Sequence, residues 1–504
     1  MKTKNFVKSL LLVSAMLTAC ELDETVYSSI YTENFYKTAS DAEAAIAAAY
    51  FPIVDMYGGP SAIMASDFSA DQTYPRAAVS RNTLTLFTYD VNYTGQRTAG
   101  REYESPQRIW IASYIGIEKA NWVIERVGGA SMDVVRRNEI IGEAYFLRAF
   151  YHWMATKNFG DVPVKIRASS TEANAFVNKS SKADVYRQIY QDLDSAIAKL
   201  PLHTAALVKG RPSKEAALTL SAKASLYNED WTRALAHAQA VFTNPYLRLM
   251  SEVKDVYDVT KEDAARVENI FAYEAESQTT VSGSTTFYGH QMTGLCGPPN
   301  NDAPTTYGRT TFGSMFAYPQ FYNSFNAADK RRALLDTTYT RSNGTVVRQR
   351  NITPITPRGV LIKKYQDPVS VTGNSNNIPI LRLADAYLIA AEAEFRLNGP
   401  TALALEYVNV VRRRAFGVPL TSPSAFDRTT LTLNDILQER SWEFFAEGDR
   451  WYDLTRTDLF LSVIPQAVNE VYPVRTPQAK HKYFPIPQDE LNANPLLEQN
   501  DPWK

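Results

Sequence analysis

The sequence is poor in the residues that most often build catalytic and metal sites. Its 504 residues include five histidines and only two cysteines, Cys20 and Cys296. The chain has no HExxH, Walker A or G-x-S-x-G motif, and its histidines show no metal-ligand spacing. We therefore predict no cofactor, no bound metal and no catalytic residue.

An excess of charge of either sign is also missing. The formal net charge is -1, the isoelectric point is near 6.6, and no long block of like charges occurs. Proteins that bind nucleic acid generally carry a basic field over part of their surface. The sequence therefore predicts no nucleic-acid partner.

No hydrophobic run is long enough to span a membrane. Lysines at positions 2, 4 and 8 precede a short apolar run from Leu10 to Leu17, whereas a spanning helix needs about 20 apolar residues. This arrangement is typical of an export signal, which we place at residues 1–19. The run ends Leu17-Thr18-Ala19-Cys20, which resembles the lipobox of bacterial lipoproteins, so Cys20 is the predicted lipidation site. The alternative is an ordinary secretory peptide with an incidental cysteine.

Once Cys20 carries lipid, Cys296 has no partner for an intramolecular disulfide. Cys296 lies six residues after His290, and catalysis by such a pair would need the two side chains to be adjacent in space. The surrounding glycines and prolines indicate an irregular loop instead. The fold must therefore be stable through packing alone.

A helix is predicted near the end of the chain, over residues 432–448. Thr432 followed by Asp435 is an N-cap with an acidic first turn, and Gly448 can take the left-handed conformation that ends a helix. The glutamates of this helix repeat every four residues and so share one row: Glu439, Glu443 and Glu447. Arg440 and Arg450 are the nearest cations that could separate these charges.

This segment also carries apolar residues, so we expect it to combine core packing with ion pairs. An alternative makes two of the glutamates the acid and base of a glycosidase. Those enzymes place their carboxylates on two sides of the substrate, and a single helical row does not provide that arrangement.

Three motifs in the chain resemble the SusD/RagB family, the surface glycan-binding lipoproteins of Bacteroidetes nutrient-uptake systems. The first is ERSWEFFAEGDRWYDL from Glu439, the second is YFPIPQDELNANPLLEQNDPW from Tyr483, and the third ends in FGDVP at Pro163. The acidic residues at 21, 23 and 24 resemble the surface-export signal of such lipoproteins. The resemblance implies a lipid-anchored outer-membrane protein that faces outward.

Helix-cap and periodicity signals agree with a largely helical chain. Starts are predicted at a capping box at residues 40–43, at Ser105-Pro106, at Asp133, and at Ser181 and Ser213. Residues 222–235 and 391–403 read as two copies of one helix-turn-helix unit with similarly placed alanines, as in tetratricopeptide repeats. We predict a mostly α, SusD-like fold with about four such helix pairs, within about residues 40–243 and 378–416.

Long irregular segments interrupt these helices. The segments at residues 58–104 and 276–312 are rich in turn-forming residues but keep several aromatics, and the resemblance places ligand binding in loops from these two parts. Short strands are predicted between residues 336 and 378, for example at 345–348. The complete layout is a signal at 1–19 and one SusD-like domain at 20–504, whose signature occupies residues 432–503.

Sugar rings present apolar faces and hydroxyl edges, so a glycan site needs exposed aromatic rings beside polar side chains. The candidates in the first loop are Asp67, Tyr74, Arg81, Tyr89, Asn92 and Tyr93. In the second they are Tyr288, Asn300, Asn301, Asp302 and Tyr307. Neither loop contains tryptophan, so stacking falls to tyrosine. The alternative for each aromatic is that it fixes its loop to the helices.

The resemblance implies a non-catalytic protein that captures an oligosaccharide and delivers it to a SusC-like, TonB-dependent transporter. One alternative is capture of peptides, as in the RagB-like members. Another is a secreted glycoside hydrolase, which turnover of a glycan by the pure protein would reveal.

Overall fold

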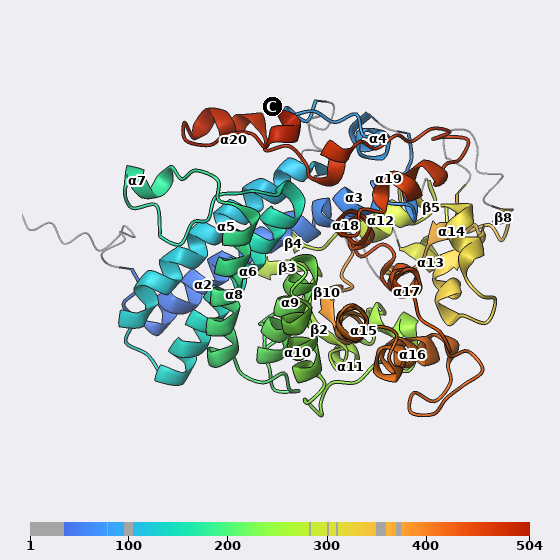
Figure 1. The fold of residues 1–504 in the computed structure, drawn as a ribbon, viewed down its shortest axis with the longest axis horizontal. Helices are drawn as coiled ribbons and strands as arrows, with labels where there is room; N and C mark the ends of the chain where they lie inside the picture. The colour runs from blue at the N-terminus through green and yellow to red at the C-terminus, as the bar shows by residue number, and fades with distance from the viewer. Residues whose placement is uncertain are drawn as a thin grey trace, which may run out of the picture.

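The computed structural model describes residues 35–77, 79–94, 104–281, 284–299, 302–308, 311–348, 359–368 and 374–504. The predicted signal at 1–19, Cys20, Asn300 and Asn301 lie outside these residues. About 53% of the structure is helical, with a few short strands (Figure 1). The predicted mostly α fold is therefore confirmed.

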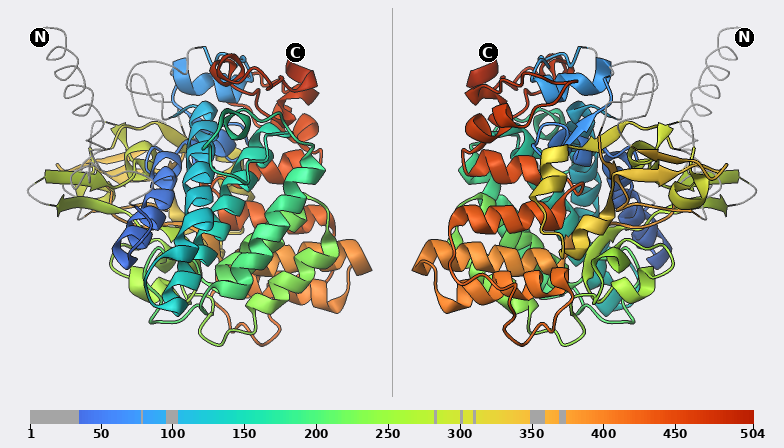
Figure 2. Two further views of the ribbon diagram at one scale, coloured as in Figure 1. Left: turned by 90° about the vertical axis from the view of Figure 1, so that its left-hand side faces the viewer. Right: turned by 90° about the vertical axis from the view of Figure 1, so that its right-hand side faces the viewer.

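Eight helices form the predicted tetratricopeptide-like pairs and supply most of the packing. The pairs are α2 (Ala39–Tyr57) with α5 (Pro106–Arg126), α6 (Val134–Phe159) with α8 (Lys182–Lys199), α9 (Lys214–Tyr227) with α10 (Trp231–Val241), and α15 (Leu383–Asn398) with α16 (Ala402–Phe416). Successive pairs also touch, α5 on α6, α8 on α9 and α10 on α15. The result is one continuous stack of helices (Figure 2).

Local capping chemistry sets where these helices begin. Ser105, Asp133, Ser181 and Ser213 each accept a backbone N–H of the first turn, as predicted. The capping box predicted at residues 40–43 is wrong, because Thr38 and Asp41 form it and α2 begins at Ala39. The Asp41 carboxylate accepts the N–H of Thr38 at 2.9 Å, which fixes the start two residues earlier.

Small residues allow the first helices of the stack to approach closely. Ala42, Ala45 and Ala49 are buried along α2, and a methyl group at Gly116 of α5 would overlap the ring of Tyr151 of α6. The Tyr151 hydroxyl donates to the Ala49 carbonyl across 2.7 Å. Three helices are thus joined through one buried tyrosine.

Short strands pair two by two to one side of the helical stack (Figure 2). The antiparallel pairs are β1 (Thr73–Pro75) with β5 (Met315–Ala317), β2 (Asn269–Tyr273) with β10 (Ile378–Arg382), β3 (Glu276–Val281) with β4 (Ser284–Tyr288), β6 (Leu335–Asp336) with β9 (Leu361–Ile362), and β7 (Thr338–Thr340) with β8 (Val346–Arg348). The β7–β8 pair includes the strand expected at residues 345–348. The second irregular region is more ordered than predicted, since it contains the β3–β4 hairpin.

Shorter helices connect these layers and complete the fold. They are α3 (Ser61–Asp67), α4 (Val79–Leu86), α7 (Glu172–Ala175), α11 (Glu262–Ala265), α12 (Met292–Cys296), α13 (Pro304–Tyr307), α14 (Pro319–Ser324), α17 (Leu433–Phe444), α18 (Arg450–Arg456), α19 (Phe460–Val463) and α20 (Gln488–Ala493). Buried apolar residues from Ala42 to Leu497 form one cluster. Within the described ranges, no helix combines the length and the apolar character that crossing a bilayer requires.

The helix predicted over residues 432–448 is shorter than expected. Thr432 and Asp435 form the predicted capping box, but α17 ends at Phe444. Ala446 and Gly448 have φ values of 59° and 85°, outside the helical range. The buried carboxylate of Asp67 accepts the N–H of Ala446 at 3.1 Å, so a residue remote in sequence holds this turn open.

Candidate functional site

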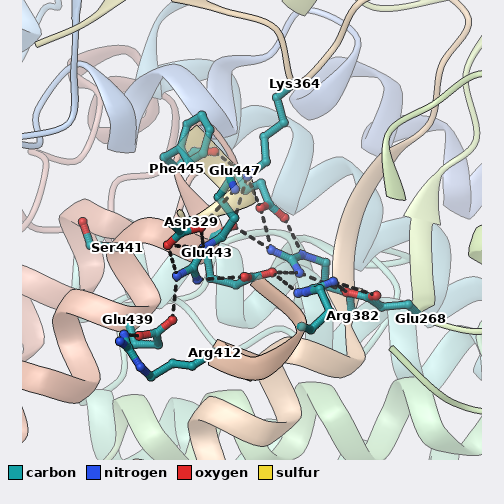
Figure 3. Close-up of polar contacts among 12 residues, drawn as sticks. Glu268, Asp329, Lys364, Arg382, Arg412, Glu439, Ser441, Glu443, Phe445 and Glu447 are labelled. Atoms are coloured by element: carbon teal, nitrogen blue, oxygen red, sulfur yellow. Dashed lines mark hydrogen bonds and ion pairs between the residues drawn. The ribbon is translucent and has the colours of Figure 1, made fainter. Parts of the chain in front are cut away.

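The glutamates of the C-terminal motif lie in a buried network of ion pairs (Figure 3). Glu443 is fully buried, and its carboxylate accepts hydrogen bonds from Arg382 at 2.6 Å, Arg414 at 2.5 Å and Arg331 at 3.1 Å. Burial alone would raise the pKa of Glu443, but the three guanidinium groups hold it well below its usual value. This side chain is therefore an anion at neutral pH.

Glu439 and Glu447 extend the network in two directions. Glu439 lies 2.8 Å from Arg331 and accepts from Arg412 at 2.6 Å. Glu447 accepts from Arg382 at 2.9 Å and from Lys364 at 2.6 Å. The prediction of core packing combined with ion pairs is confirmed.

The predicted cation partners of these glutamates were wrong. Arg440 pairs with Asp385 and Asp453, both at 2.8 Å, and Arg450 pairs with Asp71. One residue along a helix rotates a side chain by about 100°, so Arg440 faces away from the glutamate row. The actual partners come from segments 25 or more residues away and were invisible to helical spacing.

This arrangement does not suit acid–base chemistry. A general acid on a glycosidase needs a carboxyl with a raised pKa, whereas neighbouring cations outweigh burial and lower the pKa of both Glu443 and Glu447. Every one of these carboxylates is also occupied by buried basic groups. We conclude that the network stabilises the core.

Two of the predicted site residues in the first loop are engaged inside the protein. Asp67 is fully buried at the turn after α17. Arg81 is 5% exposed and binds both carboxylate oxygens of Glu104, at 2.9 and 2.5 Å. Neither side chain faces solvent.

The three predicted tyrosines of the first loop are buried as well. Tyr74 packs among the rings of Phe316, Tyr318 and Tyr472. The ring of Tyr89 contacts Phe484 and Trp503, and the Tyr93 hydroxyl donates to the Pro485 carbonyl at 2.7 Å. The expectation that these rings are exposed was wrong, because they fix the loop to the C-terminal segment. Asn92 is exposed.

The described residues among those predicted in the second loop also form contacts within the protein. Tyr307 is fully buried and donates to Asp336 at 2.7 Å, so the expectation of an exposed ring was wrong here too. Asp302 accepts from Tyr339 at 3.2 Å and pairs with Arg341 at 3.1 Å. Tyr288 ends strand β4, where it pairs with Glu276.

The structure nevertheless brings the two loop regions together. Strand β1 of the first region pairs with strand β5, which directly follows the second region, with Tyr74 opposite Phe316, and Arg76 donates to the carbonyl of Phe312 in the second region. Just beyond, the Arg76 N–H donates to the Ser314 carbonyl at 2.9 Å. A surface built from both regions therefore exists at this edge.

Phe312 is the exposed aromatic at this junction, and the sequence analysis missed it. It is 43% exposed, although its N–H donates to Gly294 and the N–H of Ser314 donates to Leu295, at 2.6 and 2.9 Å. Gly313 has a φ of 57° and packs so closely on Pro299 that a Cβ atom would lie 2.9 Å from the proline nitrogen. A fixed backbone thus presents the ring to solvent.

The sequence did contain a signal for Phe312. It is a phenylalanine followed by glycine in a threonine-rich loop, where an apolar ring has little local reason to occur. Phe312 was not among the predicted residues, because the stacking role was assigned to tyrosine in the absence of tryptophan.

A second exposed phenylalanine lies elsewhere on the protein. Phe51 of α2 is 52% exposed and lines a cavity of about 350 Å³ with Tyr50, Tyr273 and Arg211. This cavity lies between α2 and β2, apart from the β1–β5 pair in the fold. It provides a natural comparison for Phe312.

His290 and Cys296 do not form a catalytic pair. The His290 Nε2 atom lies 2.7 Å from the Asn376 carbonyl oxygen, while Cys296 is buried beside Met315. Burial raises the pKa of the Cys296 thiol, so it stays protonated. Among the described residues, no group of three or more His, Cys, Asp or Glu side chains could hold a metal ion.

Fold and surface together define a class of protein: a stack of tetratricopeptide-like helix pairs that carries a loop-built surface with an exposed ring. Two family models match this chain, the SusD family over residues 284–503 and the family described as starch-binding associating with outer membrane over residues 22–226. The chain belongs to the SusD family, which confirms the predicted resemblance.

Curated relatives match over nearly the whole chain or over part of it. SusD-like protein P2 of Formosa agariphila is 28% identical, and the alignment covers 98% of each chain. The starch-binding protein SusD of Bacteroides thetaiotaomicron is 30% identical over 155 residues, which are 29% of this chain and 26% of that one.

Solved structures share the fold. A laminarin-binding SusD-like protein is 24% identical, has a TM-score of 0.75, and is matched over 92% of this chain and 100% of its own. Surface glycan-binding protein A of Bacteroides thetaiotaomicron in complex with laminarihexaose is 23% identical, with a TM-score of 0.73 and coverage of 92% and 100%.

Proposed function

We propose that this protein is a non-catalytic cell-surface receptor that binds oligosaccharide and delivers it to a SusC-like, TonB-dependent transporter. Family membership and the glycan-binding names of several relatives support the binding role. We further propose that residues 20–504 form one domain, anchored to the outer membrane through lipid on Cys20 and facing outward.

The observation that carries this proposal is the exposed ring of Phe312. Apolar rings normally lose exposed area when a loop folds onto a core, and here the backbone is hydrogen-bonded on both sides while the ring stays 43% exposed. A rigid aromatic surface binds a sugar face with little loss of conformational entropy. The feature therefore suits stacking against a saccharide.

Polar groups for the hydroxyl edges lie beside this ring. Arg76 is half-buried, and its Nη1 atom donates to the Phe312 carbonyl at 3.4 Å. The guanidinium group has five N–H donors in a planar fork, a geometry that suits the hydroxyl edge of a sugar. The surface around Phe312 and Arg76 is the glycan site that we propose.

The originally predicted residues take a smaller part in this proposal. Asn92 is exposed and remains a candidate hydrogen-bonding residue, and so do Tyr288 and Asn301. The buried tyrosines and Asp67 instead support the loops from beneath.

The test is a glycan array followed by titration calorimetry on residues 21–504 and on two variants. Phe312→Ala should weaken binding of the captured oligosaccharide about tenfold or more, equivalent to about 1.4 kcal/mol, as expected for a central aromatic contact. Phe51→Ala removes a ring of similar exposure from α2 and should leave the affinity unchanged.

The opposite pattern, loss of affinity in Phe51→Ala alone, would move the site to the α2 cavity. Binding of peptides with no glycan bound would replace glycan capture with RagB-like peptide capture. Release of reducing sugar by the pure protein would establish a glycoside hydrolase and end the non-catalytic proposal.

A further inference from the structure

Lys157 of α6 is a buried lysine without an ion-pair partner. It is 8% exposed, and its Nζ atom lies 4.2 Å from the ring centre of Trp153 and 4.3 Å from that of Tyr452. No described residue forms a salt bridge or a hydrogen bond with this ammonium group. An ammonium has three N–H donors, and leaving them unbonded in the interior is costly.

The lysine borders a small cavity that contains a second unpartnered donor. The cavity measures about 60 Å³ and is lined by Lys157 and Tyr227 among others. The Tyr227 hydroxyl is buried and has no hydrogen-bond partner among the described residues. Burial raises the pKa of Tyr227, so its hydroxyl stays protonated and can donate. Two residues that line this cavity therefore carry donors without a hydrogen-bond partner among the described residues.

Further basic side chains line the same cavity. Lys182, Lys482 and Arg456 are present, against a single carboxylate, Glu229. Arg456 is engaged with Glu392 and Lys482 with Asp458, whereas Lys182 contacts only the ring of Tyr186 by its ammonium, at 5.6 Å. The lining of the cavity thus has more basic than acidic side chains, although the chain as a whole is nearly neutral.

We propose that this cavity, the Lys157 pocket, binds one small oxyanion group, a carboxylate or a sulfate. Its acceptor oxygens would take the N–H bonds of Lys157 and the hydroxyl of Tyr227. A water molecule needs about 10–15 Å³ of such space, so a cavity of about 60 Å³ accommodates an oxyanion of a few heavy atoms but not a sugar ring.

The carrier of the oxyanion has room in the adjoining cavity. That cavity measures about 240 Å³, shares Lys182 and Tyr483 with the Lys157 pocket, and adds Trp503 and Asn500. The ring of Trp503 is suited to stacking on the apolar face of a sugar, so the oxyanion belongs to an acidic saccharide. This last step rests on the proposed glycan-binding function, whereas the oxyanion site does not.

Proton uptake gives a readout that a purely structural lysine would not show. Burial lowers the pKa of Lys157 to about 7, so part of the population is a neutral amine near pH 7 and an anion would draw a proton in. The charged groups around the amine are Asp449, Asp385, Lys223, Lys182, Lys482, Arg456 and Glu229.

The experiment is titration calorimetry of residues 21–504 at constant ionic strength with galacturonate, glucose 6-sulfate and neutral glucose, and with acetate and sulfate as free anions. Two buffers of different ionisation enthalpy report the proton uptake. Both acidic sugars should bind with uptake of a fraction of a proton at pH 7.5, and glucose should bind at least tenfold more weakly.

Lys157→Met keeps the stem and removes the ammonium, and it should weaken binding of the acidic sugars at least tenfold and abolish proton uptake. Tyr227→Phe removes only the hydroxyl and should weaken it severalfold, which covers the case in which the lysine variant folds poorly. Lys199→Met, at an exposed position of α8, is the matched control and should bind normally.

Unchanged binding in both pocket variants, or no binding of any anion by the wild type, overturns the oxyanion site. Equal affinity for free acetate or sulfate and for the acidic sugars supports the oxyanion site but overturns the saccharide carrier. Phe312→Ala distinguishes failure of the oxyanion site from failure of the proposed function. It should weaken binding of the oligosaccharide found on the array and leave binding of the acidic sugars to the Lys157 pocket unchanged.

Discussion

At the scale of single residues, Asp67 shows how a predicted ligand contact became a support for the fold. One carboxylate oxygen accepts the Ala446 N–H, and the other has no hydrogen-bond partner in the described part of the chain. Burial raises the pKa of Asp67 to about 8, although hydrogen bonds from the turn oppose the shift. Its carboxyl is therefore protonated in the folded protein over a range where the unfolded chain carries a charge.

The sign of the resulting pH dependence follows directly. Between about pH 4 and pH 8 the folded state binds more protons at Asp67 than the unfolded state, so the free energy of unfolding falls as pH rises. Asp67→Asn should remove this contribution, and the variant should gain stability relative to wild type from pH 5 to pH 8. Urea denaturation across this range measures the difference.

Asp194→Asn is a suitable control for that series. Asp194 forms a largely exposed pair with Arg233 and should change the free energy of unfolding by less than about 1 kcal/mol. If the free energy of unfolding of Asp67→Asn changed with pH in parallel with that of the wild type, the buried protonated carboxyl would be disproved.

Tyr89 gives a second test at this scale. It is 4% exposed and its ring contacts Phe484 and Trp503. Tyr89→Ala should therefore cost about 3–5 kcal/mol of unfolding free energy by leaving a cavity, and it should lower the melting temperature. A variant with the melting temperature of the wild type would restore the expectation of an exposed ring.

Sequence alone could not decide whether the predicted aromatic rings are exposed or buried. An aromatic in an irregular loop can face solvent or the interior, and composition is the same in both cases. Tyr74, Tyr89, Tyr93 and Tyr307 became buried because segments more than 25 residues away cover them. Among the aromatic side chains of the two loops that the structure describes, Phe312 is exposed, and it precedes the left-handed turn at Gly313.

At the scale of secondary structure, local signals located most helix starts. Side chains at Ser105, Asp133, Ser181, Ser213 and Thr432 bond to N–H groups within three residues, so the sequence contains the whole interaction. The end of α17 was missed for the opposite reason. Its turn depends on Asp67, which lies in another helix.

The ion-pair network is the element-scale feature with the clearest energetic consequence. Glu443→Gln would leave Arg331, Arg382 and Arg414 facing a neutral amide in the interior. Breaking a buried pair from one side costs about 3–5 kcal/mol, and we expect that loss in chemical denaturation.

Acid should reproduce part of this effect in the wild type. The folded-state pKa of Glu443 lies below its ordinary value of 4.5, so its contribution is complete above that pH and declines as pH falls further.

The control for Glu443→Gln is Glu406→Gln. It breaks a pair whose carboxylate is 47% exposed and should cost less than about 1 kcal/mol. Equal losses in the two variants would show that the network is not strongly coupled.

At the scale of the whole molecule, the last residues complete a core begun by the first helices. Phe484 and Ile486 are buried, Asn500 donates to the Phe159 carbonyl at 2.5 Å, and Tyr93 donates to Pro485. Burial of each apolar side chain contributes about 1.5–3 kcal/mol. A chain that stops at Gln478 should therefore be less stable by at least about 3 kcal/mol.

Scanning calorimetry of the two lengths measures this effect. The shortened chain should melt at a lower temperature, and its α6 and first loop should become sensitive to protease. Removal of Lys504 alone, which forms only exposed pairs with Glu498 and Asp501, should leave melting unchanged. A shortened chain that melts like the full one would show that the C-terminal segment adds little to the core.

The contacts between Asn500 and the end of α6 also bear on biogenesis. A ribosome releases residue 159 long before residue 500, so the carbonyl of Phe159 cannot accept its hydrogen bond from Asn500 during most of translation. A chain with a predicted export signal must cross the inner membrane unfolded. A contact that forms only after residue 500 is made favours that passage. The hydrogen bond between Asn500 and Phe159 can therefore form only when synthesis of the chain is almost complete.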